Sequence, residues 1–253
     1  MVAAGVPDLK LVQLNIWQGR LLPQVLRFLK KEQPDLICLQ EVYSSSFDTP
    51  LFDFLGGFEA IQSILPGHHG FFSAVYDMAI LGEQVRFGNA LFSRYPIISE
   101  EATLTSGESH SYKTFNGYVP NTRNLQRVML AVDGHSLCLI NHHGYWDSTP
   151  FGNEQTAEKM RIVSEIVSKS PRPLIFAGDL NIVPESLAMR PLQAQLRDLT
   201  QEYKLATTLS SLGKVKNVAC DHIMVSSGIH VRQFTTSKTL VSDHKALLLE
   251  FDL

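Results

Sequence analysis

Several polar side chains with the chemistry of a metal or catalytic site stand where apolar, strand-like runs of this sequence end. Asn15 follows "LKLVQL", Glu41 follows "PDLICLQ" and Asp179 follows "PLIFAG". A core tolerates one buried acid that has a partner, but several acids at strand ends need a shared partner, and a hard divalent cation supplies it. The full set is Asn15, Glu41, His143, Asp179, Asn181, Asp221, Asp243 and His244.

Each member of this set has a plainer explanation when it is taken alone. Asp179 and Asn181 in "GDLN" can form an Asx turn after a strand, and the other residues can cap turns or strand ends. For the whole set, that explanation needs a coincidence at every position, so we favour one shared site. Oxygen ligands with histidines nearby, and no Cys-His spacing typical of zinc, favour Mg²⁺, or else Mn²⁺, as the bound ion.

Two similar strand–helix–strand units are expected to position these residues. In the first unit, a strand over 9–15 precedes an amphipathic helix and a second strand over 34–41. In the second unit, a strand over 136–143 precedes a helix with Asn153 as its N-cap and a strand over 173–179. Each unit therefore ends its strands in polar or acidic residues.

Two right-handed β-α-β units with hydrophobic strands predict an α/β fold with two sheets packed face to face and helices outside. No linker-like or low-complexity segment divides the chain, so we expect a single domain over 1–253. Further strands are predicted over 87–97, 125–133, 220–226 and 245–253. Long connections, which are candidates for function, are predicted at 43–75, 102–124 and 144–153.

The composition limits the class of protein. The chain has 253 residues, 44% of them hydrophobic, and a net charge of −3. Slight acidity argues against a dedicated high-affinity DNA binder but permits an enzyme that touches a few phosphates. The three cysteines lie in apolar runs, which favours reduced core thiols and a cytoplasmic protein. The first residues do not resemble a signal peptide, and we expect no stable membrane insertion.

The order of the motifs resembles the endonuclease/exonuclease/phosphatase superfamily, whose fold is that of deoxyribonuclease I. The matching stretches run nearly from end to end: "LNIW", "PDLICLQEV", "GNALFSRYPI", "INHHG", "GDLN", "CDHIMVS" and "SDHKAL". Single motifs such as "LQEV" or "SDH" are weak, but the ordered set is specific. The resemblance implies a four-layer α/β sandwich, two mixed β-sheets with helices on the outside, and metal-assisted cleavage of phosphoesters.

Within this resemblance, the acidic residues take separate roles. Glu41 is expected to hold the Mg²⁺, with Asn15 beside it and Asp243 as a further candidate ligand. Asp179 would orient and deprotonate the attacking water. The metal would polarise the phosphoryl group and neutralise charge on the leaving oxygen.

The amide and imidazole side chains are expected to bind the reacting phosphate. Asn15 and Asn181 can each donate an amide N–H to phosphate oxygens without adding negative charge. His143 and His244, when protonated, would stabilise the transition state, and Asp221 would hold one imidazole in orientation.

The sequence departs from the family pattern at three places. Trp17 and Gln18 stand where many related nucleases carry an acid, which makes the metal site depend more on Glu41. His222 stands where an aromatic residue is common, and we expect it to be a local hydrogen-bonding residue. His142 replaces a small residue beside the expected catalytic histidine, so the strand register decides which of the two histidines acts.

The leading hypothesis is a Mg²⁺-dependent phosphodiesterase of nuclease type, acting as a monomer with nucleic acid favoured over lipid. The alternative is a lipid-headgroup or small-molecule phosphoesterase that resembles sphingomyelinases. The slight acidity favours this alternative or a short, end-bound nucleic-acid substrate over a continuous duplex. Lys214 and Lys216, just before the Asp221 strand, weakly favour a nucleic-acid substrate over a lipid. Arg127 is a candidate phosphate contact, although a solvated arginine at a strand edge explains it equally well. A binding module without catalysis is a third hypothesis, which the retained polar set argues against.

Overall fold

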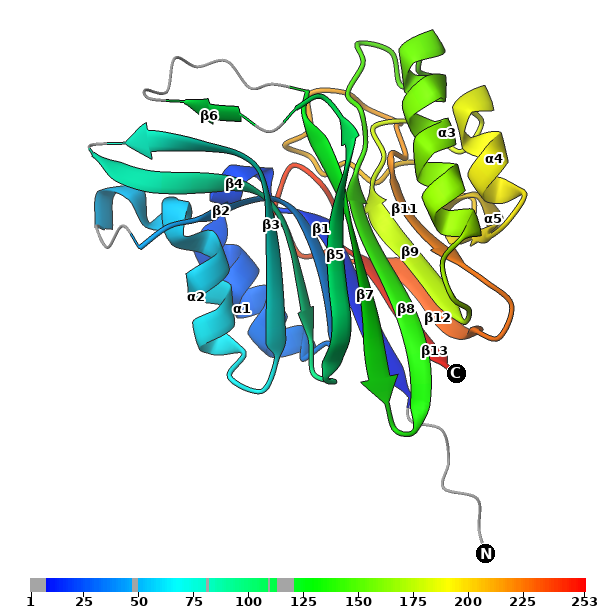
Figure 1. Cartoon of the computed structure of the whole chain (residues 1–253), viewed down its shortest axis with the longest axis horizontal. Helices are drawn as coiled ribbons and strands as arrows, with labels where there is room; N and C mark the ends of the chain where they lie inside the picture. Colours follow the sequence, from blue (N-terminus) through cyan, green and yellow to red (C-terminus); the bar gives the residue numbers. More distant parts are fainter. Residues whose placement is uncertain (1–7, 47–49, 81, 109, 113–120) are drawn as a thin grey trace, which may run out of the picture.

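Two β-sheets pack face to face, and helices cover their outer faces (Figure 1). The structure is a computed structural model that describes residues 8–46, 50–80, 82–108, 110–112 and 121–253. The arrangement is the four-layer α/β sandwich predicted from the sequence. No helix in these described ranges is long and apolar enough to cross a bilayer.

Both sheets mix parallel and antiparallel strand pairs. One sheet has seven strands in the order β12 (His230–Thr236), β13 (Leu247–Asp252), β1 (Leu9–Asn15), β2 (Leu36–Ser44), β4 (Glu83–Ser93), β3 (His69–Ile80) and β6 (His110–Tyr112). The other has six strands in the order β10 (Arg197–Asp198), β11 (Asp221–Val225), β9 (Leu174–Asp179), β8 (His135–His143), β7 (Arg123–Val132) and β5 (Ile97–Ser106).

Three apolar clusters separate the four layers. Helices α1 (Leu22–Glu32) and α2 (Gly57–Ile64) pack on the seven-stranded sheet, through residues such as Val25 and Ile61. Helix α3 (Glu154–Ser168) packs on the six-stranded sheet through Met160 and Val163, beside the short helices α4 (Arg190–Gln193) and α5 (Leu199–Glu202). The third cluster lies between the sheets and includes Leu11, Leu139 and Leu249.

The two predicted β-α-β units are confirmed. β1 pairs in parallel with β2 across α1, and β8 pairs in parallel with β9 across α3. Asn153 is the N-cap of α3, and its side chain accepts from the backbone N–H of Thr156. The Thr156 hydroxyl oxygen accepts in turn from the backbone N–H of Asn153, which completes a capping box. Parallel pairing aligns the carboxyl ends of all four strands at one edge of the sandwich, which is the upper edge in Figure 1.

Some predicted element boundaries are wrong. The strand predicted over 87–97 ends at Ser93, and the chain crosses to the other sheet, where β5 begins at Ile97. The connections predicted at 43–75 and 102–124 contain parts of β3, β5 and β6 and helix α2. β12 was not predicted, and part of the second connection lies outside the described residues. The connection at 144–153 is confirmed as a loop.

Near this edge the space between the sheets is filled by buried amide side chains. The Nε2 of Gln13 in β1 donates to Gln40 Oε1 at 2.9 Å and to Asp221 Oδ1 at 3.1 Å. The Nε2 of Gln40 in β2 donates across the sheet interface to Asn141 Oδ1 at 2.7 Å. Asn141 in β8 donates to Gln126 Oε1 in β7 at 2.8 Å. Side-chain bonds thus link the two sheets directly.

The amide network continues toward β3. Gln126 Nε2 donates to the carbonyls of Phe71 and Asn89. Asn89 Nδ2 donates to Asn124 Oδ1 at 2.8 Å, and Asn124 donates to the carbonyls of β3. The amide side chains of this network are at most 2% exposed. A buried polar group without a partner costs about 1–3 kcal/mol, so the network fixes how the sheets sit on one another.

We predict that Asn141→Ala lowers the free energy of unfolding by about 2–4 kcal/mol, because it leaves buried partners unsatisfied on both sheets. Asn121→Ala is the matched control, since the Asn121 amide bonds the backbone of Trp146 in exposed contacts, where water can replace it. Urea unfolding of the two variants measures the difference. Equal losses would show that the amide network does not hold the sheets together.

Candidate functional site

The predicted site residues meet at the edge where the parallel strands end. Asn15 ends β1, His143 ends β8 and Asp179 ends β9, and Glu41 lies near the end of β2. Within the six-stranded sheet, Asp179 pairs with His143 on one side and with Asp221 on the other. Adjacent strands therefore place these three side chains next to each other.

Gly178 allows this close approach. A Cβ on Gly178 would meet the carbonyl oxygen of His142 at 1.9 Å, so no other residue fits between β8 and β9 here. Asp179 follows, and its Oδ1 accepts from the backbone N–H of Asn181 at 2.9 Å. Asn181 has a φ of 57° and its Nδ2 donates to the carbonyl of Gly144 at 3.1 Å. Asp179 and Asn181 thus form the turn after β9 and are also members of the candidate site.

Asn15 links two carboxylates. Its Nδ2 donates to Glu41 Oε1 at 3.1 Å and to Asp179 Oδ2 at 3.0 Å, while its Oδ1 accepts from the backbone N–H of Trp17. Glu41 has a φ of 59° and lies in a bulge of β2, where the register with β4 shifts between Leu39 and Val42. The bulge turns the Glu41 carboxylate toward Asn15 and Asp179.

These carboxylates fit a divalent cation. Burial raises the pKa of Glu41, and the charges of Asp179 and Asp243 raise it further against the opposing effects of Asn15 and His244. Burial also raises the pKa of Asp179. Acids held this close in a poorly solvated place are stabilised by a bound cation, and oxygen donors are the ligands that Mg²⁺ prefers. Glu41, with Asp243 and the Asn15 side chain nearby, is a candidate ligand.

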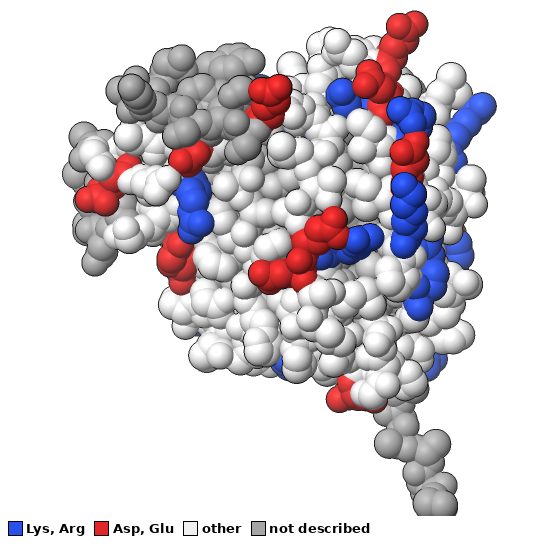
Figure 2. All heavy atoms as spheres, viewed as in Figure 1, with Lys and Arg blue, Asp and Glu red and all other residues white. Residues whose placement is uncertain are grey.

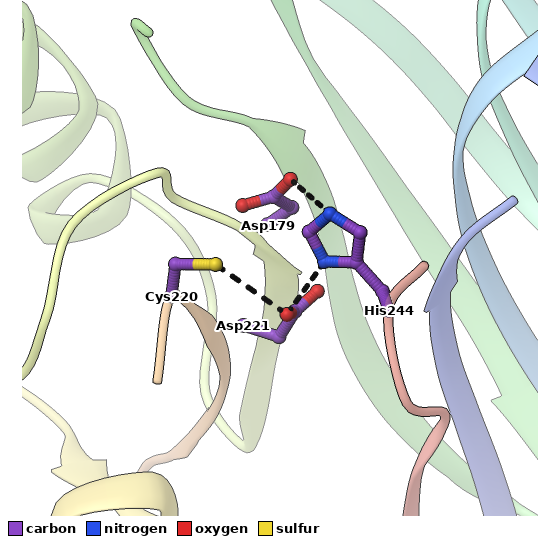
Figure 3. Close-up of side chains that lie close together, drawn as sticks. All are labelled: Asp179, Cys220, Asp221 and His244. Atoms are coloured by element: carbon purple, nitrogen blue, oxygen red, sulfur yellow. Dashed lines mark hydrogen bonds and ion pairs between the residues drawn. The ribbon is translucent and has the colours of Figure 1, made fainter. Parts of the chain in front are cut away.

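Asp221 and His244 form a buried ion pair beside Asp179 (Figure 3). His244 Nδ1 lies 2.8 Å from Asp221 Oδ2, and His244 Nε2 lies 3.7 Å from Asp179 Oδ2. Burial alone would lower the pKa of His244, but the two carboxylates raise it well above its ordinary value. Burial likewise works to raise the pKa of Asp221, yet His244 and the donors Thr208 and Gln13 hold it below its ordinary value. His244 is therefore the cation of the site.

The segment that carries His244 is anchored by its neighbours. Ser242 Oγ donates to the carbonyl of Asn15 at 2.7 Å and accepts from the backbone N–H of His244 at 3.2 Å. Thr208 Oγ1 donates to Asp221 Oδ2 at 2.6 Å, and the Thr208 carbonyl accepts from the backbone N–H of Lys245. Asp243 stays at the rim, where its Oδ1 accepts from Ser242 Oγ.

His143 and His142 point to opposite faces of β8. His143 Nε2 lies 3.7 Å from Asp179 Oδ2, whereas His142 Nδ1 lies 3.0 Å from the carbonyl of Asn124, and its ring packs edge-on against Phe176. Burial, and then the charge of Arg123, lower the pKa of His143 well below its ordinary value. The surroundings of the two site histidines thus act in opposite directions: they favour the charged form of His244 and the neutral form of His143.

The structure does not bring Arg127 to this site. Arg127 pairs with Glu101 and donates to Ser170 Oγ at 3.2 Å, and its strand position is opposite Ile140, away from the site edge. Arg123, four residues earlier, lies at that edge, and its Nε donates to the Gly144 carbonyl at 2.7 Å. Arg123 was not predicted from the sequence. The signal that points to it is the antiparallel pairing of β7 with β8, which brings the start of β7 to the end of β8.

One further departure from the family pattern, His222, has a local explanation. His222 is fully buried, with Nδ1 3.1 Å from Asp198 Oδ2 and Nε2 2.9 Å from the carbonyl of Ile182, so it is a local hydrogen-bonding residue as predicted. Gln13 and Thr208 support Asp221 but were not expected from the sequence. Both are polar residues inside ordinary strand or loop patterns, with no local signal that marks them.

The pKa shifts predict a charge pattern in the metal-free protein. In chelator, His244 should remain an imidazolium well above pH 6.5, and His143 should remain neutral at and below that pH. The contribution of His244 to stability is then full below pH 6.5 and is lost as the pH rises through its raised pKa. The contribution of Asp221 is lost as the pH falls through its lowered pKa.

NMR titration of the ring nitrogens measures both values. Asp221→Asn should bring the pKa of His244 down, because it removes the nearest negative charge. A His244 pKa that stays at the ordinary value of an exposed histidine would contradict the buried ion pair.

Comparison with known proteins gives a consistent picture of the fold. The model described as the Endonuclease/Exonuclease/phosphatase family matches residues 12–244. An endonuclease/exonuclease/phosphatase from Beutenbergia cavernae has a similar structure, with a TM-score of 0.74, 18% identity, and coverage of 97% of this chain and 72% of that chain. Comparison with curated protein sequences gives no significant match.

Two other similar structures carry named activities. The mannosyl-6-phosphatase of Bacteroides thetaiotaomicron has a TM-score of 0.71 and 17% identity over 97% of this chain and 100% of that chain. D. rerio TDP2 complexed with a single-strand DNA product has a TM-score of 0.68 and 15% identity over 97% and 99%. The family match extends from β1 to His244, so this chain belongs to the endonuclease/exonuclease/phosphatase family of phosphoric ester hydrolases.

Proposed function

We propose that the protein is a Mg²⁺-dependent phosphodiesterase of nuclease type that hydrolyses phosphodiester bonds with an activated water. The observation that carries the proposal is the environment of Asp179. Asn15 links its carboxylate to Glu41, and one nitrogen of His143 and one of His244 lie 3.7 Å from its Oδ2. The proposed metal ligand Glu41, the proposed base Asp179 and the proposed cationic donor His244 thus lie side by side.

Asp179 is the general base of this proposal. Burial raises its pKa, which makes the carboxylate a better proton acceptor than an exposed aspartate. His244, held by Asp221, offers a positive N–H to the phosphate oxygens as their charge increases. Asn181 and the neutral His143 add hydrogen bonds without charge. Mg²⁺, when held by Glu41 with Asn15 and Asp243, supplies Lewis-acid polarisation of the phosphoryl group.

Arg123 replaces Arg127 as the arginine expected to attract the substrate. Its guanidinium is buried, and burial lowers its pKa while Glu41 and Asp179 raise it. A guanidinium in this position favours an anionic ligand at the same edge.

Nucleic acid is the proposed substrate class. Exposed lysines lie on the segments that lead to Asp221 and His244, namely Lys214, Lys216 and Lys238. Trp146, three residues after His143, is 58% exposed and offers a stacking surface for a base. On the face in Figure 2, acidic and basic residues alternate without a continuous basic band, which fits a short or end-bound strand better than a long duplex. The similar TDP2 structure contains single-strand DNA.

A lipid-headgroup or small-molecule phosphoesterase is the second candidate. Phe151 and Leu187 are 61% and 68% exposed on the loops that follow β8 and β9. Such side chains can contact a lipid surface without spanning it. One similar structure is a sugar phosphatase, which acts on a smaller substrate. For either substrate we propose a monomer in the cytoplasm, and the three free, buried cysteines support a reducing compartment.

The metal proposal predicts that activity disappears in EDTA and returns with Mg²⁺ or Mn²⁺, because oxygen ligands prefer these ions. The test uses single-stranded DNA, duplex DNA, RNA, sphingomyelin, bis-p-nitrophenyl phosphate and the monoester p-nitrophenyl phosphate. Cleavage of single-stranded nucleic acid above all others supports the nuclease proposal. Preference for sphingomyelin or the monoester would support the second candidate, and full activity in EDTA would exclude both mechanisms.

His143 and His142 give a matched pair of variants in adjacent positions. His143→Ala should lower kcat by about 10²-fold or more, because its ring faces the reacting atoms. His142→Ala should keep most of kcat and lose stability, since its ring fills a buried place against Phe176. Kinetics normalised to folded protein decide the outcome. An inactive His142→Ala with an active His143→Ala would refute the assignment.

A further inference from the structure

Cys220 lies against the buried ion pair, although the proposed hydrolysis does not use it. It directly precedes β11 and is 5% exposed. Its Sγ points at Asp221 Oδ2 from 3.7 Å, and His244 Nδ1 lies 2.8 Å from the same oxygen (Figure 3). One ligand atom each from Asp179, Cys220, Asp221 and His244 lies within 4.8 Å of all the others.

Two hydrogen-bond donors therefore converge on one carboxylate oxygen. The thiol S–H and the imidazole N–H both donate to Asp221 Oδ2. Without these protons, the lone pairs of the Cys220 sulfur and the His244 nitrogen both face Asp221 Oδ2, so one cation can be bound by all three atoms. A tetrahedral zinc ion needs such atoms roughly 3.3–3.8 Å apart, given its bond lengths to sulfur and nitrogen. The observed separations of 2.8 and 3.7 Å are close to that geometry.

The donor set differs in kind from the ligands around Glu41. Thiolate and imidazole are softer ligands and favour zinc over magnesium, whereas carboxylates and amide oxygens favour magnesium. Thr208 and Gln13, which donate to Asp221, would remain as outer hydrogen-bond partners that hold this carboxylate in place.

We propose that Cys220, Asp221 and His244, with Asp179, bind a thiophilic divalent cation of the zinc class, and that this cation inhibits the hydrolase. Inhibition rests on the proposed function, but binding does not. In the binding step, bonds from the cation to sulfur and nitrogen form, and the thiol and imidazolium protons leave to solvent. No group is oxidised or reduced.

The exchange does not change the formal charge of the site when both aspartates are ionised. A doubly charged cation replaces two protons, one from the neutral thiol and one from the imidazolium. The cost of burying charge is therefore not increased by binding. Binding of the cation through His244 Nδ1 removes the imidazolium charge and the bond to Asp221 that holds the ring in the proposed mechanism, so the cation-bound protein should be inactive.

Cobalt(II) tests the site without substrate. Added to chelator-treated protein, Co²⁺ should give a thiolate-to-cobalt charge-transfer band in the near ultraviolet. Cys220→Ala should lose the band, and so should Cys220→Ser, which keeps a hydrogen-bond donor to Asp221 with a harder atom. Cys138→Ala is the matched control, because Cys138 is buried between α3 and the sheet and should leave the band intact. Zn²⁺ should displace cobalt and abolish the band.

Inhibition is then measured with bis-p-nitrophenyl phosphate in excess Mg²⁺. Zn²⁺ should inhibit the wild type, and Cys220→Ala or Cys220→Ser should need at least about tenfold more Zn²⁺ while keeping near-normal activity in its absence. No charge-transfer band in the wild type, or a band that persists in both Cys220 variants, would overturn the site. Equal zinc sensitivity, relieved by further Mg²⁺, would assign inhibition to the Glu41 region and overturn the inhibitory role. A protein that hydrolyses no phosphodiester but shows the band would refute the proposed function alone.

Discussion

Two aspartates face each other at the centre of the site, and the surrounding structure compensates for their charge. Asp179 and Asp221 are directly opposite in the register of β9 and β11 and are at most 1% exposed. Like charges opposite each other in a sheet destabilise it, and burial increases that cost. The His244 cation lies between them, and Asn15, Thr208 and Gln13 supply the remaining donors. These partners come from segments far apart in the chain. The two aspartates are therefore compensated only when both sheets are in place.

The amide network connects this pair of aspartates to the other strands of both sheets. Gln13 bonds Asp221 at one end, and Asn124 bonds the backbone of β3 at the other. Amides have directional bonds, unlike the leucines of the inter-sheet cluster, so a small slip of one sheet would break several bonds at once. The apolar cluster supplies burial, while the amides define a single relative position. The distances between candidate-site side chains on different sheets depend on that position.

The sequence predicts the residues that end long apolar strands much better than those inside them. The polar ends of β1, β2, β8 and β9 and the cap of α3 are visible locally, so the two β-α-β units and their catalytic edge follow. β3 and β12 have partly exposed residues and mixed patterns, and their strand character depends on partners far along the chain. Gln13 and Arg123 were not predicted because their importance comes from contacts across sheets or between neighbouring strand ends.

The pairing of β1 with β13 joins the beginning of the described chain to its end. Asn15 comes from the first strand, and His244 comes just before the last, with Ser242 bonded to the Asn15 carbonyl. A nascent chain on the ribosome that lacks this last segment has neither the cation between the aspartates nor the strand that completes the sheet. The site therefore cannot assemble until the segment from Ser242 through β13 has emerged, and a chain that terminates before this segment lacks His244.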